Sequence, residues 1–347
     1  MNDLISGKNV LVTGGTGSIG SEIVRQVLNR QPGELRILSR DPLKQQQLYR
    51  RLGKDRRLRW LIGDVRDPQR VHEAVRGCAV VFHAAALKHV PLCEDNPLEA
   101  VRTNILGTAN IIRAAADTDC RRVIFISTDK AAEPTNAMGA TKMLAEKLMA
   151  SALDNRQPGR PVFASVRFGN VLGSRGSVVP RFIEQMLTKR ELKLTDPGMT
   201  RFFMTIPQAV RLVLSAAEEA RGGETFVLKM PVLRIQDLAL AVAEETCRRT
   251  GLKRSDIRTR VVGRRPGEKM YEELMTEEEA TDAVEQADLG MYVIRPKGRQ
   301  PGQCLVKPPT SDALTPLPLE QIRNLIAPLV AAHPLVRQSR RQLKKEG

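Results

Sequence analysis

A glycine-rich segment near the start of the chain constrains the fold more than any other feature. The apolar run at 8–14, KNVLVTG, leads directly into Gly14, Gly17 and Gly20, and a stretch with helical periodicity follows at 18–29. Such glycines let the backbone turn sharply and let a pyrophosphate approach the free N–H groups at the start of the helix. Because the pattern follows a strand and opens a helix, it predicts a dinucleotide-binding βαβ unit. A purely structural glycine turn is the alternative.

The first half of the chain repeats this alternation of strand and helix. Further apolar runs lie at 35–39, 58–64, 79–86, 121–128 and 161–169. They are nearly continuous, as in strands that are buried on both faces. Segments of helical length separate them, at 42–52, 68–76, 97–117 and 137–153. We therefore predict an α/β fold, a Rossmann-type doubly wound parallel sheet.

The composition of the sequence and the pattern of its predicted elements change after Gly169. Gly, Pro and Arg become frequent, and candidate helices at 206–219 and 235–250 alternate with short strands. We expect three parts: an NAD(P)-binding Rossmann domain over 1–168, a smaller mixed α/β substrate-binding lobe over 169–300, and a peripheral tail over 301–347. One amphipathic helix near 319–330 is expected in that tail.

Composition excludes several classes of protein. The chain has 347 residues, of which 41% are hydrophobic, so it can build a sizeable core. No stretch approaches the roughly 18 apolar residues of a membrane span, and the polar start of the chain does not resemble a signal peptide. We expect a soluble, cytoplasmic protein with no transmembrane segment. The five scattered cysteines form no C-x-x-C pair, which predicts neither a disulfide framework nor a metal site.

The net charge of +16 raises the question of a nucleic-acid partner. The surplus is confined to three basic segments, 50–59, 248–265 and 335–347, and the rest of the chain is neutral. Aromatic residues make up only 3% of the chain, and none is interleaved with these segments. Because the stacking platform of a single-strand binder is missing, we predict that the chain does not bind nucleic acid.

The end of the second predicted strand bears on the choice of cofactor. NAD enzymes usually place an acidic residue there, whereas this chain has Ser39 and Arg40, with Lys44 one helical turn further on. These cations suit a 2′-phosphate, so NADP is favoured and NAD is the alternative. In that alternative Arg40 faces solvent and Asp41 caps the next helix. After the third strand, Asp64 is placed to bind the adenine amino group.

Several longer strings carry a family resemblance: TGGTGSIG (13–20), GDVRD (63–67), HAAALKHVPLCEDNP (83–97), Asn104, STDKAAEPTNAMGATKMLAEK (127–147), RFGNVLGSRGSVVP (167–180), TRFFM (200–204) and RRPGEKMYEEL (264–274). Together they resemble the extended short-chain dehydrogenases/reductases. More narrowly, they resemble the UDP-N-acetylglucosamine 4,6-dehydratases of bacterial polysaccharide biosynthesis. The resemblance covers roughly residues 5 to 295.

The resemblance implies a specific activity. In that family the nicotinamide oxidises carbon 4 of the sugar, water is eliminated across carbons 5 and 6, and the hydride returns to carbon 6. The expected product is a UDP-4-keto-6-deoxy-HexNAc, and both retention and inversion at carbon 5 are left open. A UDP-sugar 4-epimerase or 5-epimerase of the same fold is the alternative enzyme. A non-catalytic dinucleotide-sensing or RNA-binding protein is the alternative outside enzymes.

By the same resemblance, Asp129 and Lys130 match the acid and the base of the elimination, a pair that must lie close together near the nicotinamide. An ordinary ion pair at a strand end is the alternative. Met138 occupies the position of the usual catalytic Tyr, and Lys142 keeps the role of holding the nicotinamide ribose. Since Met cannot transfer a proton, we hypothesise that Thr128 relays the proton of the carbon 4 hydroxyl.

The resemblance also implies binding residues and assembly. The expected cofactor residues are Gly14, Thr16, Gly17, Ser18, Ile19, Ser39, Arg40, Lys44, Asp64, Val65, Ala84, Ala85, Ala86, Lys88, Asn104 and Lys142. The expected residues for the UDP-sugar substrate are Lys88 and His89 at the sugar, Asn170, Ser177 and Val178 at the nucleotide, and Arg201, Arg264 and Glu268 at the diphosphate and uridine. His89 as a structural histidine, and the arginines as surface residues, are the alternatives. A homo-oligomer, dimer or hexamer, is expected.

Overall fold

The computed structural model describes residues 3–152, 160–264, 267–296 and 307–339. It divides the chain into two compact units, and the chain passes between them several times. Unit 1 comprises Met1–Phe168, Pro207–Lys229 and Leu274–Pro308, and unit 2 comprises Gly169–Ile206, Met230–Glu273 and Pro309–Gly347.

A single large sheet forms the centre of unit 1. Its strands are β1 (Asn9–Thr13), β2 (Glu34–Ser39), β3 (Leu58–Ile62), β4 (Val80–His83), β5 (Arg122–Ile126), β6 (Val162–Arg167), β10 (Thr225–Leu228), β13 (Ala283–Gln286) and β14 (Met291–Ile294). They are arranged in the order β13-β14-β10-β6-β5-β4-β1-β2-β3. The strands from β10 to β3 pair in parallel, whereas β14 pairs antiparallel with both β10 and β13. The predicted Rossmann-type, mostly parallel sheet is confirmed.

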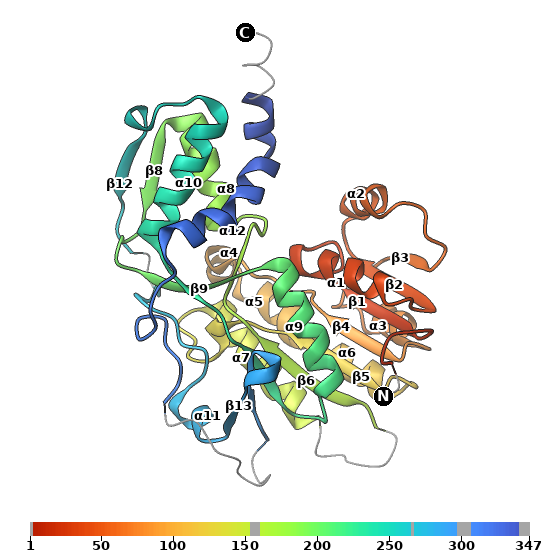
Figure 1. The fold of residues 1–347 in the computed structure, drawn as a ribbon. Coiled ribbons are helices and arrows are strands. Elements are labelled where there is room, and N and C mark those ends of the chain that lie inside the picture. The colour runs from red at the N-terminus through yellow and green to blue at the C-terminus, as the bar shows by residue number, and fades with distance from the viewer. Residues whose placement is uncertain (1–2, 153–159, 265–266, 297–306, 340–347) are drawn as a thin grey trace. The chain divides into compact units, whose positions relative to one another are not determined.

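Helices cover both faces of this sheet (Figure 1). The helical segments of unit 1 are α1 (Ser18–Asn29), α2 (Pro42–Leu52), α3 (Pro68–Val75), α4 (Val90–Asp95), α5 (Pro97–Ala100), η1 (Val101–Leu106), α6 (Gly107–Ala116), η2 (Asp129–Ala131), α7 (Ala137–Ser151), α9 (Ile206–Glu219), α11 (Glu277–Thr281) and η4 (Ala287–Leu289). Helices α3, α6 and α7 share one buried apolar cluster with Leu38, Val81 and Phe125 of the sheet. Helices α1 and α9 lie on the opposite face (Figure 1).

The helix predicted over 97–117 is not continuous. It consists of α5, the π-helical turn η1 and α6, and the short helix α4, which the sequence did not predict, precedes it. The side chain of Asn104 lies within η1 and bonds to two other segments, Leu87 and Thr141. A π-turn inserts an extra residue into a helix, and such turns are frequent at functional sites.

Unit 2 is smaller. Its strands are β7 (Asn170–Leu172), β8 (Glu191–Leu194), β9 (Thr200–Thr205), β11 (Val232–Arg234) and β12 (Arg258–Val261), and its helices are α8 (Val178–Lys189), α10 (Ile235–Thr250), η3 (Arg254–Asp256) and α12 (Leu319–Ala332). The strands form a sheet of order β11-β9-β7 and the pair β12-β8. Buried side chains of α8, α10 and α12 share one apolar core with both groups of strands.

The two units differ from the predicted division into consecutive parts. Residues 207–229 and 274–308 belong to unit 1, because β10 pairs with β6 and β14 pairs with β10. Helix α12 was expected in a peripheral tail, but Ile322, Ile326 and Val330 are fully buried against unit 2. Their spacing of four residues places these side chains on one helix face.

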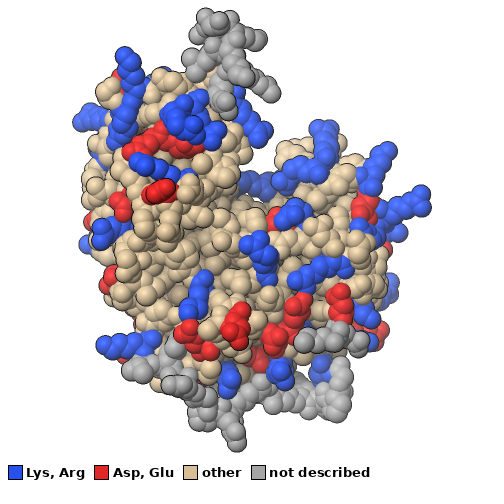
Figure 2. All heavy atoms as spheres, viewed as in Figure 1, with Lys and Arg blue, Asp and Glu red and all other residues tan. Residues whose placement is uncertain are grey.

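The structure bears on the predicted lack of a membrane span and shows where the basic segments lie. No helix in the described ranges is long and apolar enough to cross a membrane. Of the basic segments, 50–59 lies in unit 1 between α2 and β3, and Figure 2 shows many Lys and Arg side chains projecting from this part of the surface. Segment 248–265 lies in unit 2 and runs from the end of α10 through β12. Residues 265 and 340–347, and also Cys304, lie outside the described residues.

Candidate active site

The glycine loop lies at the carboxyl end of β1. Gly14 has φ 62°, and a Cβ atom there would lie 2.7 Å from the backbone of Ala85, so the loop packs directly on the segment after β4. The N–H of Gly17 donates to the carbonyl of Gly14 (2.8 Å), and Gly17 caps the start of α1. No side chain caps this helix. The N–H groups at a helix start are the donors that bind a pyrophosphate.

A buried chain of hydrogen bonds supports this loop, and the sequence did not predict it. Thr13 Oγ1 lies 2.7 Å from His83 Nδ1, and His83 Nε2 lies 3.1 Å from Thr108 Oγ1. Thr108 Oγ1 donates to the carbonyl of Asn104 (2.7 Å), so the hydroxyl accepts from the imidazole and His83 carries its proton on Nε2. Burial, and secondarily the positive charge of Lys142, lower the pKa of His83 to about 3 and keep it neutral.

A signal for this chain of bonds is present in the sequence. Thr13 and His83 lie within two predicted strands, 8–14 and 79–86. In the structure they are the last residues of β1 and β4 and are partners in the parallel register. Polar residues at the carboxyl ends of neighbouring parallel strands meet at the edge where ligands bind.

Two of the residues predicted to favour NADP, Arg40 and Lys44, form ion pairs with carboxylates. Ser39 Oγ contacts Thr16 Oγ1 (2.7 Å), which joins the end of β2 to the glycine loop. Arg40 extends from there and lies 3.4 Å from Asp64, with half of its side chain exposed. Lys44 Nζ lies 2.8 Å from Asp41.

Asp41 also caps α2, because its side chain accepts from the N–H of Lys44 and Pro42 occupies the first turn. Asp41 therefore caps α2, as the alternative interpretation of this segment expected. Arg40 is partly exposed beside Asp64, where its guanidinium lies in an ion pair at the adenine end of the predicted cofactor site.

The segment after β4 is held by Asn104. Its amide accepts from the N–H of Leu87 (2.8 Å), donates to the carbonyl of Leu87 (3.0 Å) and donates to Thr141 on α7 (3.0 Å). Asn104 itself is 1% exposed, while Lys88 and His89 are exposed. Asn104 thus ties η1, α7 and the loop of predicted cofactor residues to one another.

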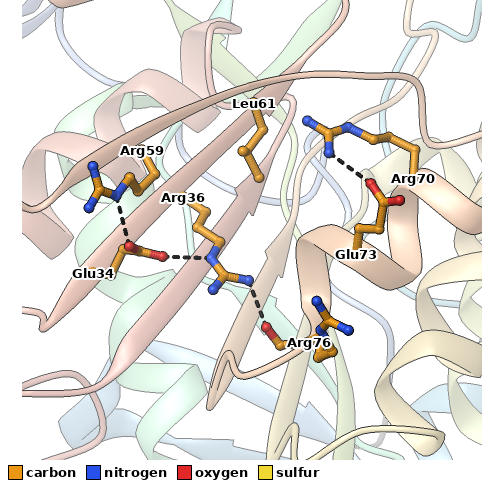
Figure 3. Close-up of a pocket in the computed structure, with 7 residues that line it drawn as sticks. All are labelled: Glu34, Arg36, Arg59, Leu61, Arg70, Glu73 and Arg76. Carbon is orange, nitrogen blue, oxygen red and sulfur yellow. Dashed lines mark hydrogen bonds and ion pairs between the residues drawn. The ribbon is translucent and has the colours of Figure 1, made fainter.

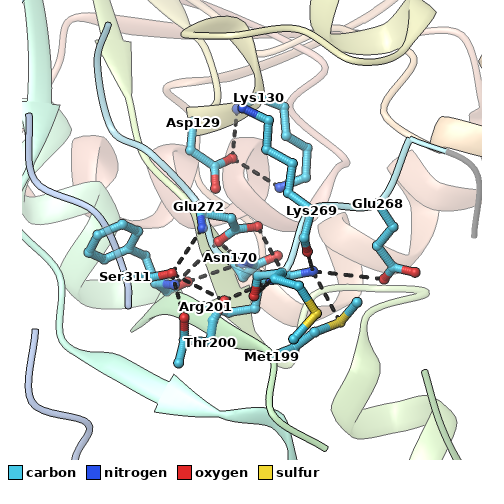
Figure 4. Close-up of polar contacts among 12 residues, drawn as sticks. Asp129, Lys130, Asn170, Met199, Thr200, Arg201, Glu268, Lys269, Glu272 and Ser311 are labelled. Atoms are coloured by element: carbon cyan, nitrogen blue, oxygen red, sulfur yellow. Dashed lines mark hydrogen bonds and ion pairs between the residues drawn. The ribbon is translucent and has the colours of Figure 1, made fainter. Parts of the chain in front are cut away.

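Thr128, Asp129 and Lys130 lie just after the end of β5 and form a compact group, as Figure 4 shows for the last two. Asp129 Oδ1 accepts from Thr128 Oγ1 (2.8 Å), from the backbone N–H of Lys130 (2.9 Å) and from Lys130 Nζ (3.0 Å). The Asp129 side chain is 1% exposed, while that of Lys130 is 32% exposed. A hydroxyl, a carboxyl and an amine therefore share one oxygen atom at the end of this strand.

Helix α7 is fitted closely against this group. At Gly139 a Cβ atom would collide with the carbonyl oxygen of Lys130, so the start of the helix touches the backbone of the group. Met138 is 4% exposed and packs with Cys93 and Ala100. At the position of the usual Tyr, the chain therefore has an apolar side chain within a small core.

Lys142 lies one turn further along α7 and is buried. Its Nζ donates to the carbonyl of Ile126 at the end of β5 (2.6 Å) and lies 4.2 Å above the Phe125 ring. Burial lowers the pKa of Lys142 to about 7, although the nearby carboxylate of Glu146 acts in the opposite direction. The amine is thus a desolvated donor at the end of β5.

A buried ion cluster anchors the far part of α7. Arg167, at the end of β6, is fully buried and bonds to Glu146 of α7 (Nη2 to Oε2, 2.5 Å) and to Glu279 of α11 (Nη1 to Oε2, 2.8 Å). Its Nη1 also donates to the carbonyl of Leu274 (3.0 Å). This cluster links three elements of unit 1 and lies outside the motifs that the sequence singled out as catalytic.

In unit 2, Arg201 of β9 lies in a network with the segment 268–272 (Figure 4). Its guanidinium donates to the carbonyls of Thr200, Lys269 and Met270, at 2.7 to 3.0 Å. Nε lies 3.4 Å from Glu272, and Nη2 lies 3.9 Å from Glu268. With 10% of its side chain exposed, Arg201 fixes the position of the segment that carries Glu268.

The network of unit 2 contains two residues that the sequence did not single out. Glu272 accepts from Asn170 Nδ2 (2.8 Å) and from the N–H of Phe202 (3.2 Å). Ser311 accepts from the N–H of Glu272 (2.9 Å) and contacts Thr200 Oγ1 (2.9 Å). Ser311 is far along the chain from the other residues, so no local motif signals it.

The remaining predicted substrate residues are less enclosed. Ser177 caps α8 without a side-chain bond to the helix, and Val178 begins that helix. The hydroxyl of Ser177 is buried and has no hydrogen-bond partner among the described residues. Arg264 is exposed. Unit 2 thus brings Asn170, Arg201 and Glu268 together through one network.

The sequence pattern of a family described as polysaccharide biosynthesis protein matches residues 10–294. The chain belongs to this family. An uncharacterized membrane protein of Methanocaldococcus jannaschii is 50% identical over 84% of this chain and 86% of its own length. A UDP-glucose 4-epimerase of Rickettsia prowazekii is 43% identical over 82% of this chain and 82% of its own length.

Solved structures extend the comparison. The structure of Pen from Bacillus thuringiensis superposes with a TM-score of 0.88 at 43% identity, and covers 93% of this chain and 98% of its own. A dTDP-glucose 4,6-dehydratase, DesIV from Streptomyces venezuelae, has a TM-score of 0.69 at 21% identity and covers 96% and 98%. At that identity the likeness shows the fold alone, and it confirms the predicted extended short-chain dehydrogenase/reductase fold for this member of the polysaccharide biosynthesis protein family.

Proposed function

We propose that the chain is an NADP-dependent UDP-N-acetylglucosamine 4,6-dehydratase. One observation carries the proposal: a hydroxyl, a carboxyl and an amine meet at Asp129 Oδ1, shortly after the end of β5, where Lys142 also donates a hydrogen bond. An elimination needs both an acid and a base at the substrate, whereas an exchange of configuration at carbon 4 needs only one group that moves a proton.

The residues of unit 1 fit a dinucleotide. Gly14 leaves no space for a side chain, α1 begins after Gly17, which has no side chain to cap the helix, and Lys142 supplies a buried donor for the nicotinamide ribose. When bound, the nicotinamide supplies oxidation at carbon 4 and reduction at carbon 6. Arg40 and Lys44 are the cations proposed for the 2′-phosphate, which would replace their present carboxylate partners Asp64 and Asp41.

The proton transfers can be written so that every proton is accounted for. Thr128 Oγ1 accepts the proton of the carbon 4 hydroxyl and passes its own to Asp129, to which it already donates. The protonated Asp129 then gives this proton to the leaving hydroxyl of carbon 6, so that water departs. Lys130, in its neutral form, removes the proton from carbon 5 and later returns it. At the end of the cycle Thr128, Asp129 and Lys130 have regained their starting protonation states.

This sequence of transfers explains how the enzyme works with Met138 in the position of the usual Tyr. The proton that a Tyr would take reaches Asp129, which needs a proton for the next step. Met138 itself packs with Cys93 and Ala100 in a small apolar core, so it supplies no proton donor or acceptor at that position.

Residues of unit 2 are proposed to bind the UDP part of the substrate. Arg264 is an exposed cation suited to the diphosphate, and the unpartnered hydroxyl of Ser177 is suited to the nucleotide. Arg201 acts through the backbone it holds and so positions Glu268 for the uridine ribose. Asn170, Val178, Lys88 and His89 complete the proposed contacts.

Mass spectrometry of UDP-N-acetylglucosamine incubated with the protein tests the proposal. A dehydratase yields a product that lacks one water molecule, and in D₂O the product gains one deuterium at carbon 5, because Lys130 exchanges its protons with solvent. An isomer of unchanged mass, without deuterium, would refute the dehydratase and establish an epimerase.

The 4-epimerase is the second candidate, and the named relative from Rickettsia prowazekii favours it. Its reaction would also use the cofactor residues and Thr128, but it would leave Asp129 and Lys130 without a role in elimination. Replacement of Lys130 by Met separates the two candidates, since it abolishes dehydration but leaves reduction of the bound cofactor by substrate.

The relay through Thr128 gives a further prediction. Thr128→Val should slow cofactor reduction, followed by absorbance in a single turnover, by about 10² to 10⁴, the usual contribution of a positioned proton acceptor. Thr128→Ser keeps the hydroxyl and is the matched control, for which we expect nearly normal rates. Equal rates for the Val variant and the unaltered protein would show that the proton leaves by another route.

A further inference from the structure

Unit 1 contains a cavity of about 270 Å³ between the edge of its sheet and α3. Its charged lining residues are Arg36, Arg59, Arg70, Arg76, Glu34 and Glu73 (Figure 3). We call it the arginine cavity. It is separate from the glycine loop, because Arg36 lies on the face of β2 that carries Leu38 and packs on α3, while Ile37 faces α1. Arg36 also precedes Ser39 by three residues, roughly 10 Å along the strand.

Three of the four arginines are held by hydrogen bonds to protein groups. Arg36 donates from Nε to Glu34 (2.7 Å) and from Nη1 to the carbonyls of Ala74 and Arg76 at the end of α3 (2.9 and 2.7 Å). Arg59 donates from Nε to the other oxygen of Glu34 (2.9 Å). A single carboxylate thus orients two guanidinium groups of neighbouring strands.

The third arginine, Arg70, lies on α3 and has two hydrogen-bond partners. Arg70 donates from Nε to the carbonyl of Ile62 (2.9 Å) and from Nη1 to Glu73 (3.0 Å). The fourth, Arg76, has no side-chain partner among the described residues, although its carbonyl accepts from Arg36. Within the described ranges, Nη2 of Arg36, Arg59 and Arg70 likewise donates no hydrogen bond to protein, so donors remain for a ligand.

The charges of this lining do not cancel. Four guanidinium groups face two carboxylates, which leaves an excess of two positive charges. Arg36 and Arg70 are 19% and 30% exposed, so water compensates their charge less well than on an open surface, whereas Arg59 and Arg76 are exposed at the mouth of the cavity. A ligand with two negative charges restores neutrality, and forked N–H groups match the oxygen atoms of a tetrahedral oxyanion.

We propose that the arginine cavity binds a small dianionic oxyanion, namely phosphate or the phosphate group of a monoester. The volume of about 270 Å³ lies below the range of roughly 300 to 1,000 Å³ typical of sites for drug-sized ligands, so a second dinucleotide does not fit. The bound anion would join β2, β3 and α3 through their arginines, at a site that is independent of the proposed catalytic reaction.

Isothermal titration of the full chain with inorganic phosphate tests the proposal. NADP and UDP are present in excess, so that the pyrophosphate and nucleotide sites are occupied, and ionic strength is held constant with chloride. We expect one phosphate per chain, competition by sulfate, and none by acetate, which is a monoanion. A parallel titration with methyl phosphate decides whether the cavity takes the monoester as well as free phosphate.

Variants locate the bound anion. Arg76→Gln removes a guanidinium that holds no protein group, so the fold is preserved, and it should weaken phosphate binding by about tenfold. Arg51→Gln, an exposed position on α2 outside the cavity, removes the same charge and should leave the affinity unchanged. Absence of phosphate binding at millimolar concentration, or equal weakening in the two variants, would overturn the proposal.

Discussion

The buried Lys142 makes folding of the cofactor-free chain depend on pH in a way that can be calculated. Its Nζ lies in the interior of unit 1, and burial lowers its pKa from 10.5 to about 7, against the opposing effect of Glu146. Replacement of Lys142 by Met keeps an unbranched side chain and removes the titrating group. The variant should be more stable than the unaltered protein in the pH range where the buried amine is costly.

The magnitude follows from the pKa shift. Between about pH 7 and pH 10.5 the unfolded chain binds a proton at Lys142 that the folded chain releases, so the free energy of unfolding of the unaltered protein rises with pH. At about 1.36 kcal/mol per unit, Lys142 contributes a change of about 3 to 4 kcal/mol between about pH 7 and pH 10. The free energy of unfolding of Lys142→Met, minus that of the unaltered protein, should therefore be larger at about pH 7 than at about pH 10 by this amount.

The chain offers a suitable probe for the measurement. Trp60 is its one tryptophan, lies on β3 of unit 1, and stacks edge-on with Tyr49 at 6.0 Å. Its fluorescence during urea denaturation therefore follows the unit that contains Lys142. Lys147→Met, at an exposed position on the same helix, is the matched control and should show no such pH dependence. A difference between Lys142→Met and the unaltered protein that is independent of pH would refute the reasoning.

Two further predictions concern the support of the site. Gly14→Ala should reduce dinucleotide affinity at least tenfold in a fluorescence titration, because the added Cβ meets backbone at 2.7 Å; Gly53→Ala has a similar positive φ with open space around it, and normal affinity is expected there. Arg167→Met leaves the buried Glu146 and the partly buried Glu279 without their cation and should lower the free energy of unfolding by about 3 to 5 kcal/mol, measured through the same fluorescence. A loss below about 1 kcal/mol would contradict the assigned role of this cluster.

Local sequence determines the strands, the helices and the group at the end of β5. The glycine loop, the run of buried strands and the adjacent Thr128, Asp129 and Lys130 are all short-range patterns, and the structure shows the three residues in mutual contact. Parallel strands between helices bring their carboxyl ends to one edge, so the placement of these residues follows from the fold class. The substitution of Met138 for Tyr is likewise visible in the sequence itself.

Tertiary structure decided everything that depends on contacts between distant segments. Strand β10 joined the sheet of unit 1 although it follows residues of unit 2, because its backbone pairs with β6. The hydrogen bonds of His83 and the network of Ser311 join segments separated by 25 to 111 residues, which no local pattern specifies. The sequence shows that the basic surplus lies in few segments, but only the fold brings Arg36, from β2, beside Arg76, at the end of α3. Charge is a property of the residues, whereas a binding site for charge depends on where the backbone places them.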